Sequence, residues 1–463
     1  MTKKLWGGRF KKKTDSQFDA FSSSLRWDWR LLPYDLQIDR AHVKALVKCR
    51  VLKKSEAAKL LSALSKIEKR FQDPARIRRK AHEDVHSAVQ EELAKFVGAL
   101  ADKIHTARSR NDLVSQSARL YCRDHALKIL SMISELQTEV VKKAERYQQV
   151  LVPGMTHMQN AQALSQGHIF LAYAEMLERA KFRFQGALPF FDVCVLGSGA
   201  LAGVTYDLDQ KLIARELGLS CVTPNSYDVS GDRDFILNFL SCMLLLNLQI
   251  SRISEDLMIG QTKGFSVVNV DQAFCTGSSM MPQKKNADFL ELARGAAGVF
   301  AGNFVGFGMT LKALPTSYNR DLQWDKKYVF DSVETCEEIL SIFIRMFKSL
   351  KINEEKAREL LADETLYATD LADYLVKKGA AFGTAHHQVG RIVNFSEKNK
   401  TALSKIGLDI LRHFAPKTEA DVYELFDAKH SVRMKKTIGS THPDQVKKQI
   451  QFWKMKLRNI RRL

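Results

Sequence analysis

The chain has 463 residues, of which 45% are hydrophobic and 27% charged, and its formal net charge is +19. The composition is that of a globular protein, and the length exceeds what one hydrophobic core usually serves. A basic surplus can indicate nucleic acid, but no zinc-finger spacing, RNA-recognition signature or basic heptad region accompanies it, so we expect no nucleic-acid partner.

The first 35 residues read as a loosely structured arm with aromatic anchors. Helical patterning begins near Asp35 and runs, with a break around Pro74, towards Leu100. After Asp112, apolar residues recur three or four apart, and no proline occurs before Pro153. This spacing predicts a helix of unusual length that ends near residues 152–154.

Further long helices are predicted over about 165–184, from Phe235 towards Gly260, and over about 288–311. The uncharged stretch 235–251 contains two asparagines, two serines and a glutamine, so it is too polar and too short for lipid. We interpret it as a helix buried inside a bundle and expect no membrane partner. After about residue 350, shorter helices alternate with polar turns.

Several long helices with short connections predict an all-α bundle fold in three domains. The expected domains are an N-terminal helical domain with an extended arm (1–110), a central long-helix bundle (111–355) and a small C-terminal helical domain (356–463). Helices that are apolar all round usually bury against other subunits too, which favours a homo-oligomer.

The seven cysteines include no CxxC pair, and their number is odd. This usage favours reduced thiols over a disulfide framework or a zinc site. The first ten residues lack the apolar stretch of a signal peptide. We therefore expect a cytoplasmic protein.

The segment His82–His86 matches the HExxH pattern of zinc proteases. The extended pattern would need glycine at 89 and histidine at 92, where Val89 and Glu92 stand. The basic run before the segment also lacks the apolar flank of a zinc-protease helix. We expect no metal here and prefer an anion-facing His86.

Two arginines, two hydroxyls and an amide lie between His105 and Asp112, just before the longest predicted helix. A helix N-terminus attracts anions, and arginine offers a two-donor fork to a carboxylate. Simple helix capping by Ser109 or Asn111 is the alternative. A second candidate is His157, between two predicted helices, where a carboxylate partner could hold it as an acid or base.

The segment Gly277–Asn286 packs small, flexible and cationic residues into one short loop. Such a loop suits a lid that closes over an anion, although an exposed polar loop has the same composition. There is no Walker loop, no Rossmann glycine motif and no GxSxG elbow, so phosphoryl transfer, hydride transfer and serine hydrolysis lose support.

This loop resembles the GSSxMPxKxN signature of the fumarase/aspartase superfamily, and its PQKKN form is similar to that of the argininosuccinate lyases. The resemblance extends over most of the chain. Further matching segments are 5–10, 83–86, 105–112, 154–162, 196–203, 232–235 and 368–376. The sequence departs from the family pattern at Met155, at Ala287, where proline is usual, and at 381–386.

The resemblance implies a three-domain fold whose central helices assemble into a homotetramer core of about 20 helices. It implies a reversible β-elimination that converts argininosuccinate into L-arginine and fumarate, in arginine biosynthesis, without a cofactor. It also implies that each active site is completed by three subunits.

By similarity, Ser278 removes the proton next to a carboxylate, giving a carbanion with aci-carboxylate character. Lys284 and Asn286 stabilise the added charge, and His157, oriented by Glu291, serves the departing guanidinium. The implied substrate contacts are Ser24, Asn111, Thr156, Asn286, Tyr318, Gln323 and Lys326, with Asp28, His86 and Arg110 beside them.

Three alternatives stay open. Another superfamily enzyme acting on a different succinyl adduct would share the elimination centre, but Gln323 and Lys326 favour argininosuccinate. A structural protein could retain the fold, as some lens crystallins do, but the joint presence of Ser278, His157, Lys284 and Glu291 favours an enzyme. A basic nucleic-acid-binding protein is supported by charge alone.

Overall fold

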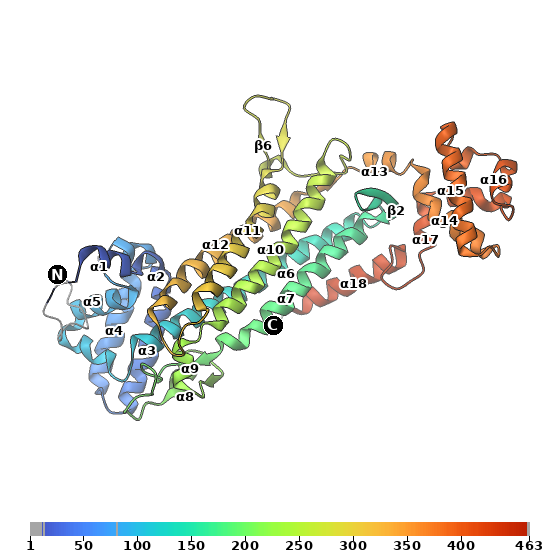
Figure 1. The fold of residues 1–463 in the computed structure, drawn as a ribbon. Coiled ribbons are helices and arrows are strands. Elements are labelled where there is room, and N and C mark those ends of the chain that lie inside the picture. The colour runs from blue at the N-terminus through green and yellow to red at the C-terminus, as the bar shows by residue number, and fades with distance from the viewer. Residues whose placement is uncertain (1–11, 13, 80–81, 461–463) are drawn as a thin grey trace. The chain divides into compact units, whose positions relative to one another are not determined.

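The structure is a computed structural model that describes residues 12, 14–79 and 82–460, so the matching segment 5–10 lies outside the described residues. Figure 1 shows the described chain as helix almost throughout, which confirms the all-α class. Five helices have 24 residues or more. They are α6 (Arg110–Arg146), α7 (Gln166–Phe191), α10 (Asp234–Gln261), α11 (Asp288–Leu311) and α12 (Asp325–Ser349).

The periodicity predictions for the long helices are confirmed, and the predicted helix 288–311 matches α11 at both ends. The predicted end of the first long helix was wrong. α6 ends at Arg146, and the chain continues into the hairpin β1 (Leu151–Thr156) and β2 (Gln159–Ser165). Gly154 permits this pairing, because a Cβ there would lie 2.4 Å from Leu164 Cδ1 across the hairpin.

The chain divides into two compact units, and each long helix contributes one part to each unit. Unit 1 comprises the described residues up to Ser131, Ala180–Asn247 and Ala297–Glu338. Unit 2 comprises Met132–Arg179, Leu248–Ala296 and the described residues from Ile339. The three-domain division at residues 110 and 355 stays a prediction.

Unit 1 opens with short helices, so the expectation of a loosely structured arm is wrong for its described part from Ser16 onward. Asp15 caps the first helix by accepting from the backbone N–H groups of Gln17 and Phe18, and Pro33 lies in the first turn of α3, where a missing N–H is tolerated. The short helices of the arm are α1 (Ser16–Ser22) and α2 (Leu25–Asp28). The helical patterning predicted from near Asp35, with a break around Pro74, is confirmed by α3 (Leu32–Lys48), α4 (Lys54–Arg70) and α5 (Val85–Val97).

The rest of unit 1 packs around a core that includes Ile38, Leu113, Leu196 and Leu217. Its shorter elements are the 3₁₀ segments η1 (Trp29–Leu31), η2 (Pro74–Arg79), η3 (Gly98–His105) and η5 (Arg320–Trp324), the helices α8 (Gln210–Glu216) and α9 (Ser226–Gly231), and the parallel pair β3 (Val193–Cys194) and β4 (Cys221–Val222).

Unit 2 contains the hairpin, two further antiparallel strand pairs and the C-terminal helices, which confirms the shorter helices predicted after residue 350. The strand pairs are β5 (Val268–Asn269) with β8 (Lys351–Ile352) and β6 (Thr276–Gly277) with β7 (Lys285–Asn286). The helices are α13 (Glu354–Leu360), α14 (Ala368–Lys377), α15 (Phe382–Asn399), α16 (Leu408–Phe414), α17 (Ala428–Arg433) and α18 (Pro443–Ile460).

α10 is long and apolar enough to cross a membrane by length and composition alone, but core helices of soluble proteins meet the same test. Half of its most apolar stretch is buried inside the chain. The absence of a membrane partner stays a prediction.

Candidate active site

The predicted site residues fall into two groups, each within one unit. Unit 1 holds Ser24, Asp28, His86, Arg110, Asn111, Tyr318, Gln323 and Lys326, and unit 2 holds Thr156, His157, Ser278, Lys284, Asn286 and Glu291.

In unit 1, Ser24 and Asp28 form a buried hydrogen-bonded pair at the two ends of α2. The Ser24 hydroxyl donates to Asp28 Oδ2, and Asp28 Oδ1 accepts from the backbone N–H of Val85 at 3.1 Å. Burial raises the pKa of Asp28 to about 6 and the nearby Asp84 carboxylate adds to the rise, whereas His86 and Lys326 oppose it. Burial and the neighbouring carboxylate therefore outweigh the two cations in setting the pKa of Asp28.

His86 lies in the first turn of α5, with its ring inside the same buried cluster. Its Nδ1 is 2.6 Å from Asp35 Oδ1, and both side chains are almost fully buried. Burial by itself lowers the pKa of His86, but Asp35, followed by Asp84 and Asp28, raises it above its ordinary value. His82 lies instead beside Glu91, at 3.5 Å, so the two histidines of the HExxH pattern serve different carboxylates.

Arg110 begins α6 and meets carboxylates of the protein. Its Nη1 lies 3.1 Å from Glu83, its Nε lies 3.2 Å from Asp84, and its Nη2 donates to the Ser87 hydroxyl at 2.8 Å. Arg108 donates to Asp39 in a pair that is also buried. The two arginines line one small pocket together with His86, and Asp35, Asp39 and His105 belong to its lining as well.

The start of α6 is capped by side chains, as the alternative interpretation of this segment proposed. The Ser109 hydroxyl accepts from the backbone N–H of Asn111 at 3.2 Å, and Asn111 Nδ2 donates to Ala200 O at 3.1 Å. The Asp112 carboxylate accepts from the backbone N–H groups of Gly197 at 3.2 Å and Gly199 at 2.9 Å. Capping and the predicted carboxylate binding thus concern neighbouring residues of one segment.

The residues of segment 318–326 approach the cluster from α12 and the turn before it. Gln323 Nε2 donates to Ser22 O at 2.8 Å, two residues before Ser24. Lys326 is buried and lies 3.0 Å from Asp325, whose other oxygen accepts from Arg233 at 3.0 Å. Tyr318 is half-buried. Burial by itself lowers the pKa of Arg110, but Asp84 and Glu83, and after them Tyr318, raise it above its ordinary value.

In unit 2, the signature loop rises from the β6–β7 pair, whose partners Thr276 and Asn286 close its base. The Ser278 hydroxyl oxygen accepts from the backbone N–H groups of Met280 at 3.3 Å and Met281 at 3.1 Å. Lys284 is exposed, and Met280, at the outer end, is 87% exposed. The loop therefore stands away from its own unit, held only at its stem.

His157 lies at the tip of the β1–β2 hairpin, which joins α6 to α7, so the prediction that it lies between two helices is confirmed. Thr156 pairs with Gln159, so His157 and Met158 are the two central residues of the turn, with φ of 52° and 61°. Thr156, His157 and Glu291 are all exposed. No hydrogen bond or ion pair joins His157 to Glu291 among the residues that the structure describes, so their pairing stays a prediction.

Sequence reasoning missed Asp35 and Asp39 as members of the buried cluster, whereas Arg108 is one of the two arginines that it singled out in segment 105–112. Asp35, Asp39 and His42 recur four and three residues apart on α3, which places them on one helix face. The signal that could have identified them in the sequence is the helical spacing of these titratable residues. No group of three or more His, Cys, Asp or Glu side chains suited to a metal ion occurs within the described ranges.

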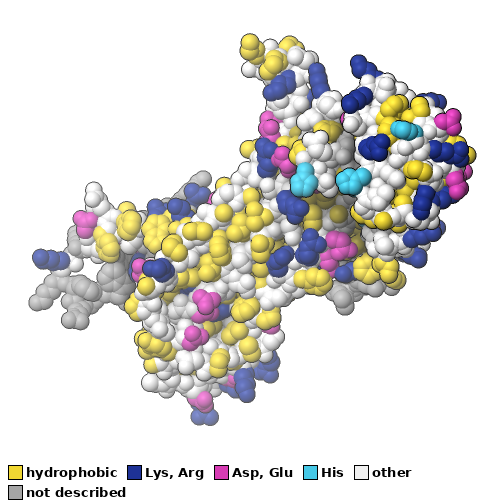
Figure 2. Space-filling model, turned by 45° about the vertical axis from the view of Figure 1, so that its right-hand side comes forward, with side chains coloured by type: hydrophobic (Ala, Val, Ile, Leu, Met, Phe, Trp, Pro, Cys, Tyr) yellow, Lys and Arg dark blue, Asp and Glu magenta, His cyan; other side chains and the backbone are white. Residues whose placement is uncertain are grey.

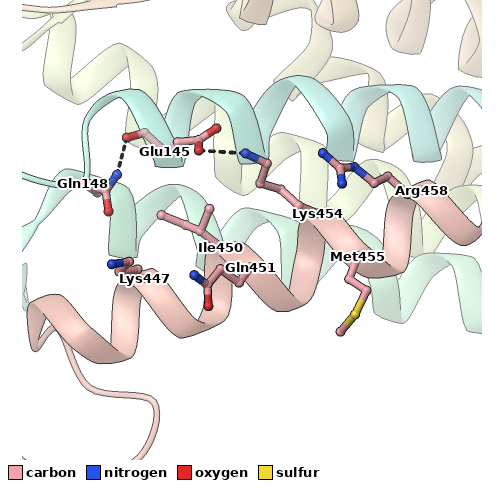
Figure 3. A pocket seen from close by; sticks show the side chains of 8 residues that line it. All are labelled: Glu145, Gln148, Lys447, Ile450, Gln451, Lys454, Met455 and Arg458. Carbon is pink, nitrogen blue, oxygen red and sulfur yellow. Dashed lines mark hydrogen bonds and ion pairs between the residues drawn. The ribbon is translucent and has the colours of Figure 1, made fainter.

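A hollow of about 630 Å³ lies elsewhere in unit 2, along α18 and the end of α6 (Figure 3). Lys454 crosses it to pair with Glu145 at 2.8 Å. None of its lining residues belongs to the predicted site.

Comparison with known proteins covers nearly the whole chain. A family model described as "Lyase" matches residues 8–302, and one described as "Argininosuccinate lyase C-terminal" matches residues 365–433. The argininosuccinate lyase of Caldicellulosiruptor saccharolyticus is 42% identical over 455 residues, 98% of either chain. That of a Sulfurihydrogenibium species is 40% identical over 451 residues, which cover 97% of this chain and 98% of the relative.

Among solved structures, a variant of EDDS lyase with bound fumarate superposes with a TM-score of 0.81 at 26% identity. The match covers 96% of this chain and 89% of that one.

Proposed function

Because this chain belongs to the argininosuccinate lyase family, we propose that it cleaves argininosuccinate into L-arginine and fumarate, reversibly and in arginine biosynthesis. The observation that carries the proposal is the 42% identity to a named argininosuccinate lyase over 98% of both chains. The chain is accordingly a lyase that breaks a carbon–nitrogen bond.

In the proposed mechanism, Ser278 removes a proton from the succinyl carbon next to a carboxylate. The electron pair left behind delocalises into that carboxylate, which is stabilised by Lys284 and Asn286. This electron pair then forms the double bond of fumarate as the bond to the guanidino nitrogen breaks. His157, oriented by Glu291, supplies or directs the proton that the guanidino nitrogen takes up as it leaves with the electron pair of the broken bond.

A neutral serine is a poor base, so the proposal requires something that stabilises its alkoxide. The two backbone N–H groups of Met280 and Met281 that point at the Ser278 oxygen support this role. Hydrogen bonds to the charged form of a group lower its pKa. Lys284, six residues along the same loop, adds a cation when the loop closes.

We assign substrate binding to the buried cluster of unit 1, and we propose Thr156 and Asn286 as further substrate contacts. His86 and Lys326 supply positive charge for the substrate carboxylates, and Ser24, Asn111, Tyr318 and Gln323 supply hydrogen bonds. Asp28 and Arg110 orient these groups through their own partners.

We further propose a homotetramer in which three subunits complete each active site. His157, Lys284 and Glu291 are exposed in a single chain, although the proposed chemistry needs a site closed to water. Figure 2 shows many hydrophobic side chains open to solvent, and those on α11 include Val299, Val305 and Met309. All seven cysteines are free, in keeping with a cytoplasmic location.

The test is to incubate the purified protein with argininosuccinate and to follow fumarate by its ultraviolet absorbance. Fumarate production supports the proposal. Fumarate from aspartate or adenylosuccinate, but none from argininosuccinate, would move the chain to another reaction of the superfamily. No turnover of any succinyl compound would favour a structural protein.

A further inference from the structure

His86 is paired with Asp35, which is not one of the predicted substrate-binding residues. Asp35 lies on α3, is 1% exposed, and places Oδ1 2.6 Å from His86 Nδ1. The other ring nitrogen, Nε2, is buried and has no hydrogen-bond partner within the described part of the chain. The ring is therefore fixed at one nitrogen and lacks a protein partner at the other.

The charges around the ring favour its protonated form. The groups that face it are Asp35 and Asp39 from α3, Asp28 from α2, Asp84 before α5, His105 at the end of η3, and Arg108 and Arg110 in the pocket wall. The carboxylates nearest to it raise its pKa although burial lowers it. In the imidazolium both nitrogens carry protons, so Nε2–H is a charged donor.

A histidine that merely fills the core is the alternative. His42, in the same unit, is such a ring: burial lowers its pKa to about 3, so it is neutral, and its Nε2 meets Thr106 O at 2.8 Å. Its Nδ1, like His86 Nε2, is buried without a partner in the described part of the chain. His86 differs from His42 in its raised pKa and in lining the pocket. A buried charged donor without an acceptor is costly, and it lines a pocket with two arginines, where an anion can supply the acceptor.

We infer that Asp35 is a positioning residue: it holds the His86 ring through Nδ1 so that Nε2–H donates to a carboxylate of the bound substrate. The inference rests on the proposed function for the identity of the substrate. The fumarate dianion, as the product, offers the same carboxylate chemistry and can be titrated without turnover.

The test compares Asp35→Asn, His86→Gln and the double variant. Because Asp35 acts through His86, Asp35→Asn should raise KM for argininosuccinate at least about tenfold, with a smaller change in kcat. In the His86→Gln background the same substitution should have little further effect. Asp370→Asn is the matched control, since Asp370 is equally buried and ion-paired, with Lys435, in unit 2.

The pH dependence separates positioning from simple loss of structure. Without the Asp35 carboxylate the pKa of His86 falls. On raising the pH, the ring of the variant therefore loses its positive charge earlier than the ring of the wild-type protein. The Asp35→Asn defect should therefore be smaller at pH 6 than at pH 8. Asp28, with a pKa of about 6, titrates in both proteins, so the ratio of variant to wild type is compared.

Equal effects of Asp35→Asn with and without His86, or a defect of the same size at both pH values, would overturn the inference. Calorimetric titration with fumarate gives a second readout. If the wild-type protein cleaves no argininosuccinate, the proposed function fails. The inference would still be supported if Asp35→Asn bound fumarate more weakly than wild type and the control Asp370→Asn did not. Unchanged fumarate affinity would overturn it in either case.

Discussion

The reactivity assigned to Ser278 depends on where its oxygen is held. Two successive backbone N–H groups, of Met280 and Met281, point at that oxygen within the loop itself. The loop thus carries part of the stabilisation that an alkoxide needs before any substrate or second subunit arrives.

Removing this hydroxyl should therefore remove the base without disturbing the fold. Ser278→Ala should lower kcat by about 10²–10⁴-fold, because it removes the proposed base. The fold should be undisturbed, because Ser278 is half-buried and its hydroxyl bonds within its own loop. Fumarate absorbance measures the rate, and the molecular mass in solution checks the assembly. The neighbouring Ser279→Ala should lose far less. A fully active Ser278→Ala variant would exclude Ser278 as the base.

The hairpin that presents His157 carries backbone strain at its tip. A two-residue hairpin turn of type I′ needs positive φ at both central residues, and Asn-Gly is the favoured pair, yet His157 and Met158 stand here at 52° and 61°. Strain of this kind persists where function requires the side chain. The proposed role of His157 accounts for the positive φ at that residue. Nothing in the single chain accounts for the positive φ of Met158.

Met158→Asn should therefore stabilise the protein, since asparagine tolerates this conformation and Met158 is 62% exposed. The expected gain is about 0.5–1 kcal/mol of unfolding free energy. It would be seen as a higher thermal midpoint, with turnover retained. A lower midpoint would instead mean that the methionine side chain is buried between subunits.

Sequence reasoning missed the hairpin, the first two helices and the long helix α12. It identified the other four long helices, because many turns repeat one apolar face. The hairpin has no Asn-Gly turn, and Pro153 within β1 argued against a strand, so its signal was absent. The helices α1 and α2 are only 7 and 4 residues long, too short for periodicity to reveal.

For the site, the sequence motifs identified the groups but not their contacts. The cluster of Ser24, Asp28 and His86 joins segments about 60 residues apart, and only the packing of α2, α3 and α5 brings Asp35 against His86. The predicted partnership of His157 with Glu291 involves two exposed side chains, so a single chain does not determine it.

At the scale of the whole molecule, the apolar side chains of α11 that are exposed in the single chain favour a face that another subunit covers. Val305 and Met309 are 55% and 63% exposed and lie four residues apart, on one side of the helix. Uncovered apolar residues at helical spacing on a long helix favour packing against another subunit.

Val305→Glu should therefore dissociate the assembly and abolish turnover, because a buried unpaired carboxylate costs several kcal/mol. Sedimentation or light scattering gives the mass, and fumarate absorbance gives the rate. Ile438→Glu is the control, since Ile438 is 95% exposed in a turn before α18. A Val305→Glu protein with unchanged mass would show that this face of α11 is not an interface.

The anchored stem and free tip of the signature loop have an entropic consequence. Strand pairing and the bonds from Thr276 to Asp288 hold the base, while residues 278–284 extend beyond it. Drawing these residues down over a ligand costs about 1–2 kcal/mol of backbone entropy for each residue that becomes ordered. In the proposed mechanism a succinyl group engages the loop and must offset that loss, whereas free arginine does not. Calorimetry should thus find a more unfavourable entropy for succinyl-bearing ligands than for arginine itself.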